Sequence, residues 1–371
     1  MSDEPRRARA AWALYDAAGR CAQQGNAEAV IDDAGLSVGT NHVAFVDADG
    51  FSAADYRIEL ELWPAGRLVL TELGRRFEKF TQALRKARNQ ARVAGLLAHG
   101  PAVPEVFEGV VLLPPPARPV ELQVYPTHVT LVPADSDPWQ IPFGALSDVV
   151  VDDDPPAVAL VRGEERTVIG QLARRRDVFL ALIHAKRDAQ AQTLARYTNR
   201  GDFADGVGVP RDRLAGFDML LSRCSSAERL DGAKKILAHA SGSEPRIGFV
   251  QLLDPDEETL QASSPLPENW AGFLLVPVRG QVVLELLAGP SAATYVFEGP
   301  IDAVNRDLQQ LHFRRAALAL TPAQAEIAPD NPHRLALRRL APLQRLRNAT
   351  RARLIHDERW NDALSAALAA D

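Results

Sequence analysis

The chain has little cysteine, little lysine and no long apolar run. Its 371 residues include two cysteines, Cys21 and Cys224, fewer than a secreted disulfide framework uses, so we expect both to be buried structural thiols. No apolar run approaches the roughly 18–20 residues that cross a membrane. The charged segment from Met1 to Arg9 is followed by no apolar signal-peptide core. These absences favour a cytoplasmic protein.

Motifs for catalysis, phosphate binding and metal binding are also missing. The sequence has no GxSxG, no GxGxxG after a predicted strand, no phosphate loop and no HExxH. Asp47-Ala48-Asp49-Gly50 resembles a calcium loop, but its first and twelfth ligand positions fall on Phe45 and Tyr56, which fail as ligands. We therefore predict no catalytic residue, no metal and no cofactor. His312, beside Arg314 and Arg315, is the one histidine that merits a test.

The balance of charge argues against a nucleic-acid partner. The net charge is −6, and arginine (37) far outnumbers lysine (5). No part of the chain has the basic excess that binding to a phosphate backbone requires. No aromatic residues interleave with the cations on the predicted helix that follows Leu73, so a platform for single-stranded nucleic acid is not expected either.

One unit occurs twice in the sequence, about 99 residues apart. Each copy reads as strand, turn, strand and then a helix with one apolar face. The shared positions are Leu73, Arg75, Arg76, Phe80 and Arg88 in the first copy, and Leu172, Arg174, Arg175, Phe179 and Arg187 in the second. A constant offset over that span indicates a duplicated small β-module.

The expected organisation follows from this repeat. We predict an α+β protein with tandem small β-barrel or sheet modules, each closed by a C-terminal helix, and extra helical segments elsewhere. The expected parts are an N-terminal helix (1–25), a first module (26–97), a proline-rich linker (98–119), a second module (120–195), a helical insert with a degenerate third β/helix unit (196–320) and C-terminal helices (321–371).

The second module carries a resemblance to a known family. Its segment from Trp139 to Leu146, which reads WQIPFGAL, resembles the central strand of bacterial pleckstrin-homology-like (PH-like) domains. The first module is similar through Val43-Ala44-Phe45, the segment from Tyr56 to Leu62 and its helix, with Asn41 at the position of the Trp. The resemblance covers 26–195 and implies a curled, partly open barrel that a helix closes.

The same resemblance bears on the ligand. Some PH-like domains bind phosphoinositide head groups through basic residues in the loop after the first strand, and many bind peptides or proteins instead. The corresponding loops here, Ile31 to Gly35 and Tyr125 to His128, contain no lysine or arginine. An anionic head group would be repelled by the acidic first loop.

We therefore predict a non-catalytic binding or scaffold protein for a protein or peptide partner. The partner would lie in the groove between the last strand and the helix of a module, or add a strand to a sheet edge. The candidate contacts are two arginine pairs and one basic helix face: Arg75, Arg76, Arg174, Arg175, Arg85, Lys86 and Arg88. The structural alternative is that their stems cover the barrel rim while their heads stay in water.

Two other functions stay open. The first is peripheral binding to an anionic membrane surface through Arg75, Arg76, Arg85, Lys86 and Arg88. The second is an enzyme whose catalytic residues are dispersed along the chain. The sequence names neither the partner, the pathway nor the oligomeric state.

Overall fold

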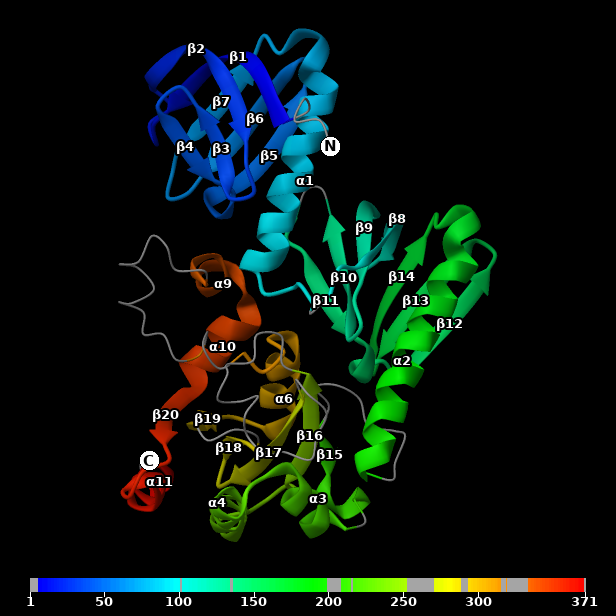
Figure 1. Ribbon diagram of the computed structural model, residues 1–371, viewed down its shortest axis with the longest axis vertical. Helices are drawn as coiled ribbons and strands as arrows, with labels where there is room; N and C mark the ends of the chain where they lie inside the picture. Colours follow the sequence, from blue (N-terminus) through cyan, green and yellow to red (C-terminus); the bar gives the residue numbers. More distant parts are fainter. Residues whose placement is uncertain are drawn as a thin grey trace. The chain divides into compact units, whose positions relative to one another are not determined.

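The computed structural model describes residues 6–100, 102–133, 136–198, 208–214, 216–251, 270–287, 293–314, 318 and 333–369. The chain is an α+β protein with three antiparallel sheets, which confirms the expected class (Figure 1). It divides into two compact units. The first contains residues 1–98, 132–139 and 325–339, and the second contains 99–131, 140–324 and 340–371.

The first sheet has seven strands in the order β4-β3-β2-β1-β7-β6-β5. Its strands are β1 (Arg7–Tyr15), β2 (Cys21–Ile31), β3 (Gly35–Val38), β4 (Asn41–Ala44), β5 (Ala48–Ala54), β6 (Arg57–Leu62) and β7 (Arg67–Thr71). The short helices η2 (Phe45–Asp47) and η3 (Gly74–Arg76) precede β5 and α1 (Phe77–Gly95), respectively. Helix α1 presents Phe80, Leu84 and Ala87 to the apolar face of the sheet, and these side chains belong to its core.

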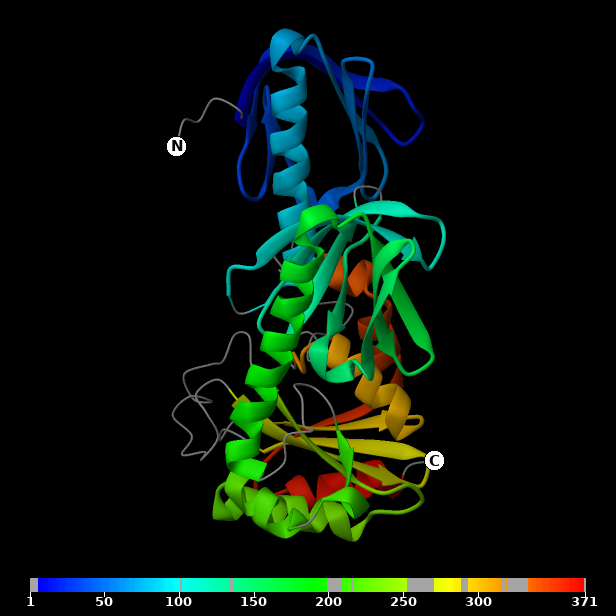
Figure 2. The same cartoon turned by 90° about the vertical axis from the view of Figure 1, so that its right-hand side faces the viewer.

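The second sheet repeats this topology with the order β11-β10-β9-β8-β14-β13-β12. Its strands are β8 (Glu105–Leu113), β9 (Arg118–Val124), β10 (His128–Pro133), β11 (Trp139–Pro142), β12 (Asp148–Asp153), β13 (Pro156–Arg162) and β14 (Glu165–Gly170). They are accompanied by η4 (Phe143–Ala145), η5 (Ala173–Arg175) and α2 (Arg176–Thr198), which runs along this sheet (Figure 2). Phe80 and Phe179, which the repeat pairs, are 1% and 0% exposed.

The third sheet is a meander of six strands in sequence order. It contains β15 (Val209–Pro210), β16 (Arg246–Gln251), β17 (Trp270–Val278), β18 (Gln281–Leu286), β19 (Ala293–Glu298) and β20 (Thr350–Ile355), with η6 (Arg211–Arg213) after β15. Its helices are α3 (Phe217–Cys224), α4 (Ala227–Ala238), α6 (Ile301–Gln310), α10 (Ala341–Ala349) and α11 (Trp360–Ala369). A further short helix, α9 (Arg334–Arg339), belongs to the first unit.

Helices cover both faces of the third sheet. Helices α3, α4 and α11 lie on one side of it, and α6 and α10 lie on the other (Figures 1 and 2). Strand β17 is buried at every position as a result. A strand covered on both faces reads as a continuous apolar run rather than an alternating one, and β17 reads WAGFLLVPV.

The predicted N-terminal helix over 1–25 is wrong, because β1 and the first part of β2 occupy that segment. The helical reading relied on the spacing of Trp12 and Tyr15. The buried residues are Ala8 and Ala10, which alternate with arginines along a strand. Alanine contributes little to an apolar pattern, so this period of two is faint in the sequence.

The predicted linker over 98–119 is also wrong, because it contains all of β8 and the start of β9. Its prolines flank β8, while Phe107 and Val111 within that strand are buried. The second module therefore begins at Glu105 rather than at residue 120, and the first begins at Arg7 rather than at residue 26.

The third unit is not a copy of the first two, because its strand order differs from theirs. The expected helices in it are present, and Ser226 caps α4 by accepting a hydrogen bond from the backbone N–H of Arg229 at 3.4 Å. The C-terminal part is not purely helical, since β20 adds a strand. The turn predicted at Gly289-Pro290 and most of the polar, glycine-rich stretch from Asn199 to Val209 lie outside the described residues.

Candidate partner-binding site

Two of the predicted arginines make equivalent structural contacts. The Nη1 of Arg76 donates a hydrogen bond to the backbone oxygen of Arg7 at 3.0 Å. Its counterpart Arg175 donates to the backbone oxygen of Val106 at 2.8 Å. Each arginine therefore ties the start of its helix to the first strand of its own sheet, which explains why the pair recurs.

A third repeated arginine is structural too. The Nε of Arg88 donates to the backbone oxygen of Ala48 at 3.2 Å, just after η2. Its counterpart Arg187 donates to the backbone oxygen of Leu146 at 3.4 Å, just after η4. These bonds join each long helix to the corner of its sheet. Arg88 is buried, and burial lowers its pKa to about 10.

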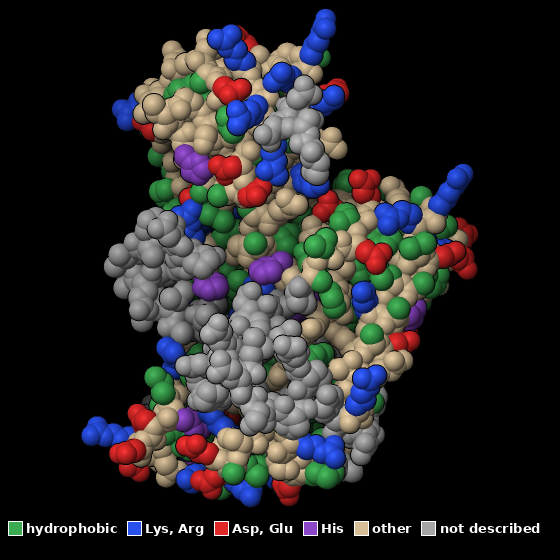
Figure 3. All heavy atoms as spheres, viewed as in Figure 1, with side chains coloured by type: hydrophobic (Ala, Val, Ile, Leu, Met, Phe, Trp, Pro, Cys, Tyr) green, Lys and Arg blue, Asp and Glu red, His purple; other side chains and the backbone are tan. Residues whose placement is uncertain are grey.

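The other predicted cations lie in water. Arg75, Arg85, Lys86 and Arg174 are exposed. The guanidinium of Arg85 lies 5.3 Å from the centre of the Phe51 ring. On the face of the first unit that Figure 3 shows, basic and acidic side chains are interspersed rather than gathered into one basic patch.

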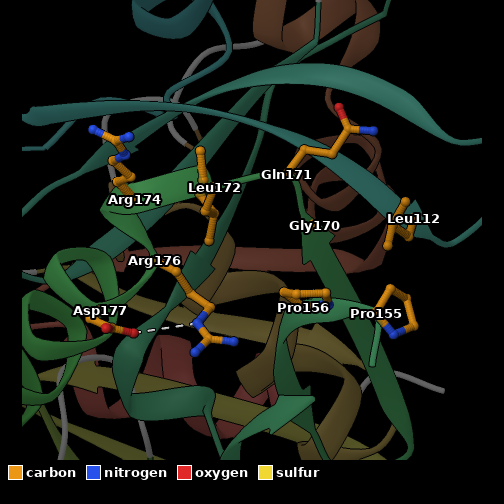
Figure 4. Close-up of a pocket in the computed structure, with 10 residues that line it drawn as sticks. Leu112, Pro155, Pro156, Gly170, Gln171, Leu172, Arg174, Arg176 and Asp177 are labelled. Atoms are coloured by element: carbon orange, nitrogen blue, oxygen red, sulfur yellow. Dashed lines mark hydrogen bonds and ion pairs between the residues drawn. The ribbon is translucent and has the colours of Figure 1, made fainter. Parts of the chain in front are cut away.

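A cavity of about 600 Å³ opens at the start of α2 (Figure 4). Its walls come from β8, the turn between β12 and β13, the end of β14 and the first residues of the helix. The lining residues are Leu112, Pro155, Pro156, Gly170, Gln171, Leu172, Ala173, Arg174, Arg176 and Asp177. It thus lies between the last strand and the helix of the second module, where a peptide groove was expected.

The backbone around this cavity includes residues in the left-handed region. Gly170 is the last residue of β14, and a Cβ there would lie 2.9 Å from Cδ1 of Leu112. Gln171 and Ala173 hold φ angles of 58° and 48°, which residues with a side chain seldom adopt. The first module has the same conformation at the matching positions, with Glu72 at φ 61° and Gly74 at φ 52°, so this backbone conformation belongs to the fold that the two modules share.

Charge is placed unevenly around the cavity. Arg176 forms ion pairs with Asp153 at 2.9 Å and with Asp177 at 3.3 Å, and the hydrogen bonds that it donates to both carboxylates raise its pKa. Its side chain extends from α2 toward the turn that contains Pro155 and Pro156 (Figure 4). Arg174 has no carboxylate partner within the part of the chain that the structure describes. The cavity therefore combines apolar walls with one uncompensated positive charge.

The corresponding place in the first module is built differently. Tyr56 and Phe77 stand where the second module has Pro155 and Arg176, and their ring centres are 5.2 Å apart. Two aromatic rings thus contact each other where the second module has a proline and an ion-paired arginine. The duplicated modules have diverged at this point while keeping the same strand order.

His312 lies in a cluster of imidazoles rather than on the surface. It is 3% exposed, and its Nε2 is 2.8 Å from Oε1 of Gln140. Its ring centre is 4.5 Å from that of His128, which in turn stacks on Tyr125 at 4.8 Å. Burial, and then the neighbouring His128, Arg314 and His99, lower the pKa of His312 well below its usual range. Arg315 lies outside the described residues.

Sequence reasoning missed a buried polar network in the third sheet. Glu285 on β18 is fully buried and pairs with Arg229 of α4 at 2.9 Å. Thr294 donates its hydroxyl proton to Glu285 at 2.6 Å, and Trp360 donates to the hydroxyl oxygen at 2.9 Å. His356 lies 2.9 Å from the same carboxylate. The one signal in the sequence is an acidic residue within the apolar run QVVLEL.

This network brings together a threonine, a histidine and a carboxylate. The Thr294 hydroxyl donates to Glu285 and accepts from Trp360, and its oxygen also lies 3.0 Å from Nε2 of His356. The residues tie α4, β18, β19 and α11 to one another.

The two cysteines differ in exposure. Cys224 is buried, as expected for a structural thiol, and burial raises its pKa to about 12. Cys21 is exposed, so the prediction that both thiols are buried is wrong for this residue. Among the described residues, no group of three or more His, Cys, Asp or Glu side chains could hold a metal ion. Nor is any helix in the described ranges long and apolar enough to cross a membrane.

The chain matches no protein-family model and no curated protein.

Proposed function

We propose that this chain is a non-catalytic binding protein, and that its two seven-stranded sheets with their helices are PH-like modules. The order 4-3-2-1-7-6-5 occurs in both sheets, and each is followed by a short 3-10 helix and a long α-helix. In the first module that helix contributes to the sheet's core. These features support the resemblance to the PH-like class.

The single observation that carries the function is the cavity at the start of α2. Its walls are largely apolar, and its exposed arginine, Arg174, has no carboxylate partner among the described residues. Pockets of a few hundred Å³ with apolar walls and a few placed polar groups are typical of ligand sites. We infer that it receives an apolar side chain of an extended peptide, with an acidic residue of that peptide against Arg174.

A neighbouring sheet edge supports an extended ligand. Strand β12 is the last strand in the order of the second sheet, and among the described residues it pairs with β13 alone. Its other edge presents backbone donors and acceptors that a peptide strand can use. The turn after β12 leads directly to Pro155 and Pro156 in the cavity wall, so one peptide could use both features.

The test is peptide selection on the full chain, followed by affinity measurements. Short peptides displayed on phage are selected on the wild-type protein, and the enriched peptide is labelled for fluorescence anisotropy. Arg176→Phe places in the second module the residue that the first module has at Phe77, and we expect it to fill the cavity. This substitution should weaken the binding of the enriched peptide by at least about tenfold, or about 1.4 kcal/mol.

Controls separate the cavity from general damage. Arg174→Ala should also weaken the binding of an acidic peptide. Lys186→Ala, on α2 but outside the cavity lining, should leave the affinity for the peptide unchanged. If selected peptides bind the Arg176→Phe and wild-type chains equally well, the proposed site is wrong.

The membrane alternative has its own test. Vesicles of anionic or neutral lipid are sedimented with the protein at low salt and at about 0.15 M salt, where screening acts over roughly 8 Å. Selective binding that persists at the higher salt and disappears in an Arg85→Glu/Lys86→Glu variant would replace the peptide proposal with a lipid one.

A further inference from the structure

The first unit contains a helix from far along the chain. Helix α9 packs against the corner after β4 and the end of α1, and its Leu335 is fully buried. A Cβ on Gly95 would lie 3.0 Å from Cδ2 of Leu335 and 3.2 Å from Cγ1 of Val46. Glycine at the last position of α1 therefore leaves the space in which Leu335 sits.

Arginines of α9 surround this apolar contact with ion pairs. Arg334 pairs with Asp47 at 2.8 Å, and Arg338 pairs with Asp49 at 3.0 Å. Arg339 lies between two carboxylates, 3.1 Å from Asp49 and 2.9 Å from Asp137.

Two uncharged groups add to the recognition of Arg338. Its guanidinium carbon lies 4.6 Å from the centre of the Trp63 ring, and its Nη2 donates to the backbone oxygen of Val46 at 2.8 Å. The contact therefore combines an apolar anchor, charge pairing and a cation–π interaction, as interfaces between proteins do.

The charges at this contact do not cancel. Arg88 and Arg92 of α1 already donate to the backbone oxygens of Ala48 and Asp49 at the same corner, and Arg92 also forms an ion pair with Asp137. Burial and the charges of Arg88 and Arg339 lower the pKa of Arg92 to about 9. The three arginines of α9 thus bind three carboxylates beside two further cations. That repulsion offsets part of the attraction and favours a contact that can open.

We propose that this surface, formed by Val46, Asp47, Asp49, Trp63, Gly95 and Asp137, is a docking site for a short basic helix. Helix α9 occupies it as an intramolecular ligand. A partner protein that presents the same pattern, an Arg followed by Leu and by an Arg pair four and five positions later, replaces α9 and releases it. This surface shares no residue with the cavity at the start of α2.

The experiment uses a labelled synthetic peptide with the sequence of residues 331–341, NPHRLALRRLA. Its binding to the full chain is measured by fluorescence anisotropy. In the wild-type chain α9 competes at high effective concentration, so the peptide should bind weakly. An Arg338→Glu/Arg339→Glu chain, whose own α9 is repelled by the carboxylates, should bind the peptide at least tenfold more tightly.

Two further variants of that opened chain test the surface itself. Asp47→Asn/Asp49→Asn should weaken the binding of the peptide at least tenfold and reduce the dependence of this binding on salt. Trp63→Ala removes only the half-exposed ring beneath Arg338. It should weaken the binding of the peptide several-fold without unfolding the unit.

Clear results would overturn the proposal. Failure of the peptide to bind the opened chain more tightly than the wild-type chain would show that α9 is a fixed part of the unit. Equal binding to the opened chain with and without Trp63→Ala, in a protein whose thermal unfolding is unchanged, would show that the peptide binds elsewhere. Neither result bears on the selected peptide at α2, so the two proposals fail separately.

Discussion

Neighbouring arginines at the start of α2 have different roles although the sequence gives them the same surroundings. Arg175 reaches back to the backbone of Val106 and lies over the Phe107 ring at 4.1 Å. Arg174 lines the cavity. The paired arginines therefore divide into one that stabilises the fold and one whose side chain is exposed at the cavity.

This division predicts opposite effects of two adjacent substitutions. Arg175→Ala should lower the free energy of unfolding by about 1 kcal/mol, because it removes a hydrogen bond and a cation–π contact at a partly solvated site. Arg174→Ala should change stability by less than about 0.5 kcal/mol, as for most surface positions. Urea unfolding followed by circular dichroism measures both, and equal losses would contradict the assignment.

His312 predicts how stability depends on pH. Its pKa is lowered in the folded chain by burial and by His128, Arg314 and His99. Below about pH 6.5 the unfolded chain takes up a proton that the folded chain excludes. Stability is therefore fully present above that pH and falls as the pH drops toward the lowered pKa, by up to about 1.4 kcal/mol per pH unit.

The measurement is the midpoint of thermal unfolding between pH 5 and 7. His312→Gln keeps an amide that can donate to Gln140 and removes the titrating group, so we expect a shallower decline toward acid pH. His184→Gln, at an exposed position on α2, is the matched control. An unchanged slope in His312→Gln would contradict the prediction.

At the scale of elements, the Glu285 network joins two helices to the third sheet. Glu285→Ala would leave the guanidinium of Arg229, whose side chain is 7% exposed, without its carboxylate. Removing one partner of a buried ion pair typically costs 3–5 kcal/mol, roughly, because the other charge stays buried. We expect the third sheet with α4 and α11 to unfold at a markedly lower denaturant concentration.

An exposed pair on the same helix provides the comparison. Asp231→Ala breaks the ion pair with Lys235, which is 2.8 Å long and lies on the surface of α4. Such pairs contribute about 0.3–0.5 kcal/mol. Losses of similar size in the Glu285→Ala and Asp231→Ala chains would show that burial does not strengthen the network.

The sequence predicted some of these elements and not others for physical reasons. The repeat was visible because Phe80 and Arg88 recur with Phe179 and Arg187 at one spacing, and helix periodicity located the helices. Strand β1 was missed because alternating arginine and alanine carry a weak apolar signal. Strand β8 was predicted as part of a linker because prolines lie at both of its ends.

The candidate sites were less predictable than the fold. The predicted groove between the last strand and the helix stays a prediction, and the difference between Tyr56/Phe77 and Pro155/Arg176 at that place requires the strand register. Ion pairs between α9 and the corner after β4 join residues nearly 300 positions apart, such as Arg338 and Asp49. No local sequence pattern can predict such pairs.

At the scale of the whole molecule, both units are completed by the last part of the chain. The first takes residues 325–339 and the second takes 340–371. Strand β20 pairs along β19 and forms the last strand of the third sheet.

This arrangement has a consequence during synthesis on the ribosome. Until residues 334–355 have emerged, Asp47 and Asp49 lack the arginines of α9, and β19 presents an unpaired edge. Exposed strand edges are prone to pair with other chains. The first unit and the third sheet therefore stay incomplete until residues 334–355 have been synthesised, and a nascent chain that stalls before β20 would be an early target for chaperones and proteases.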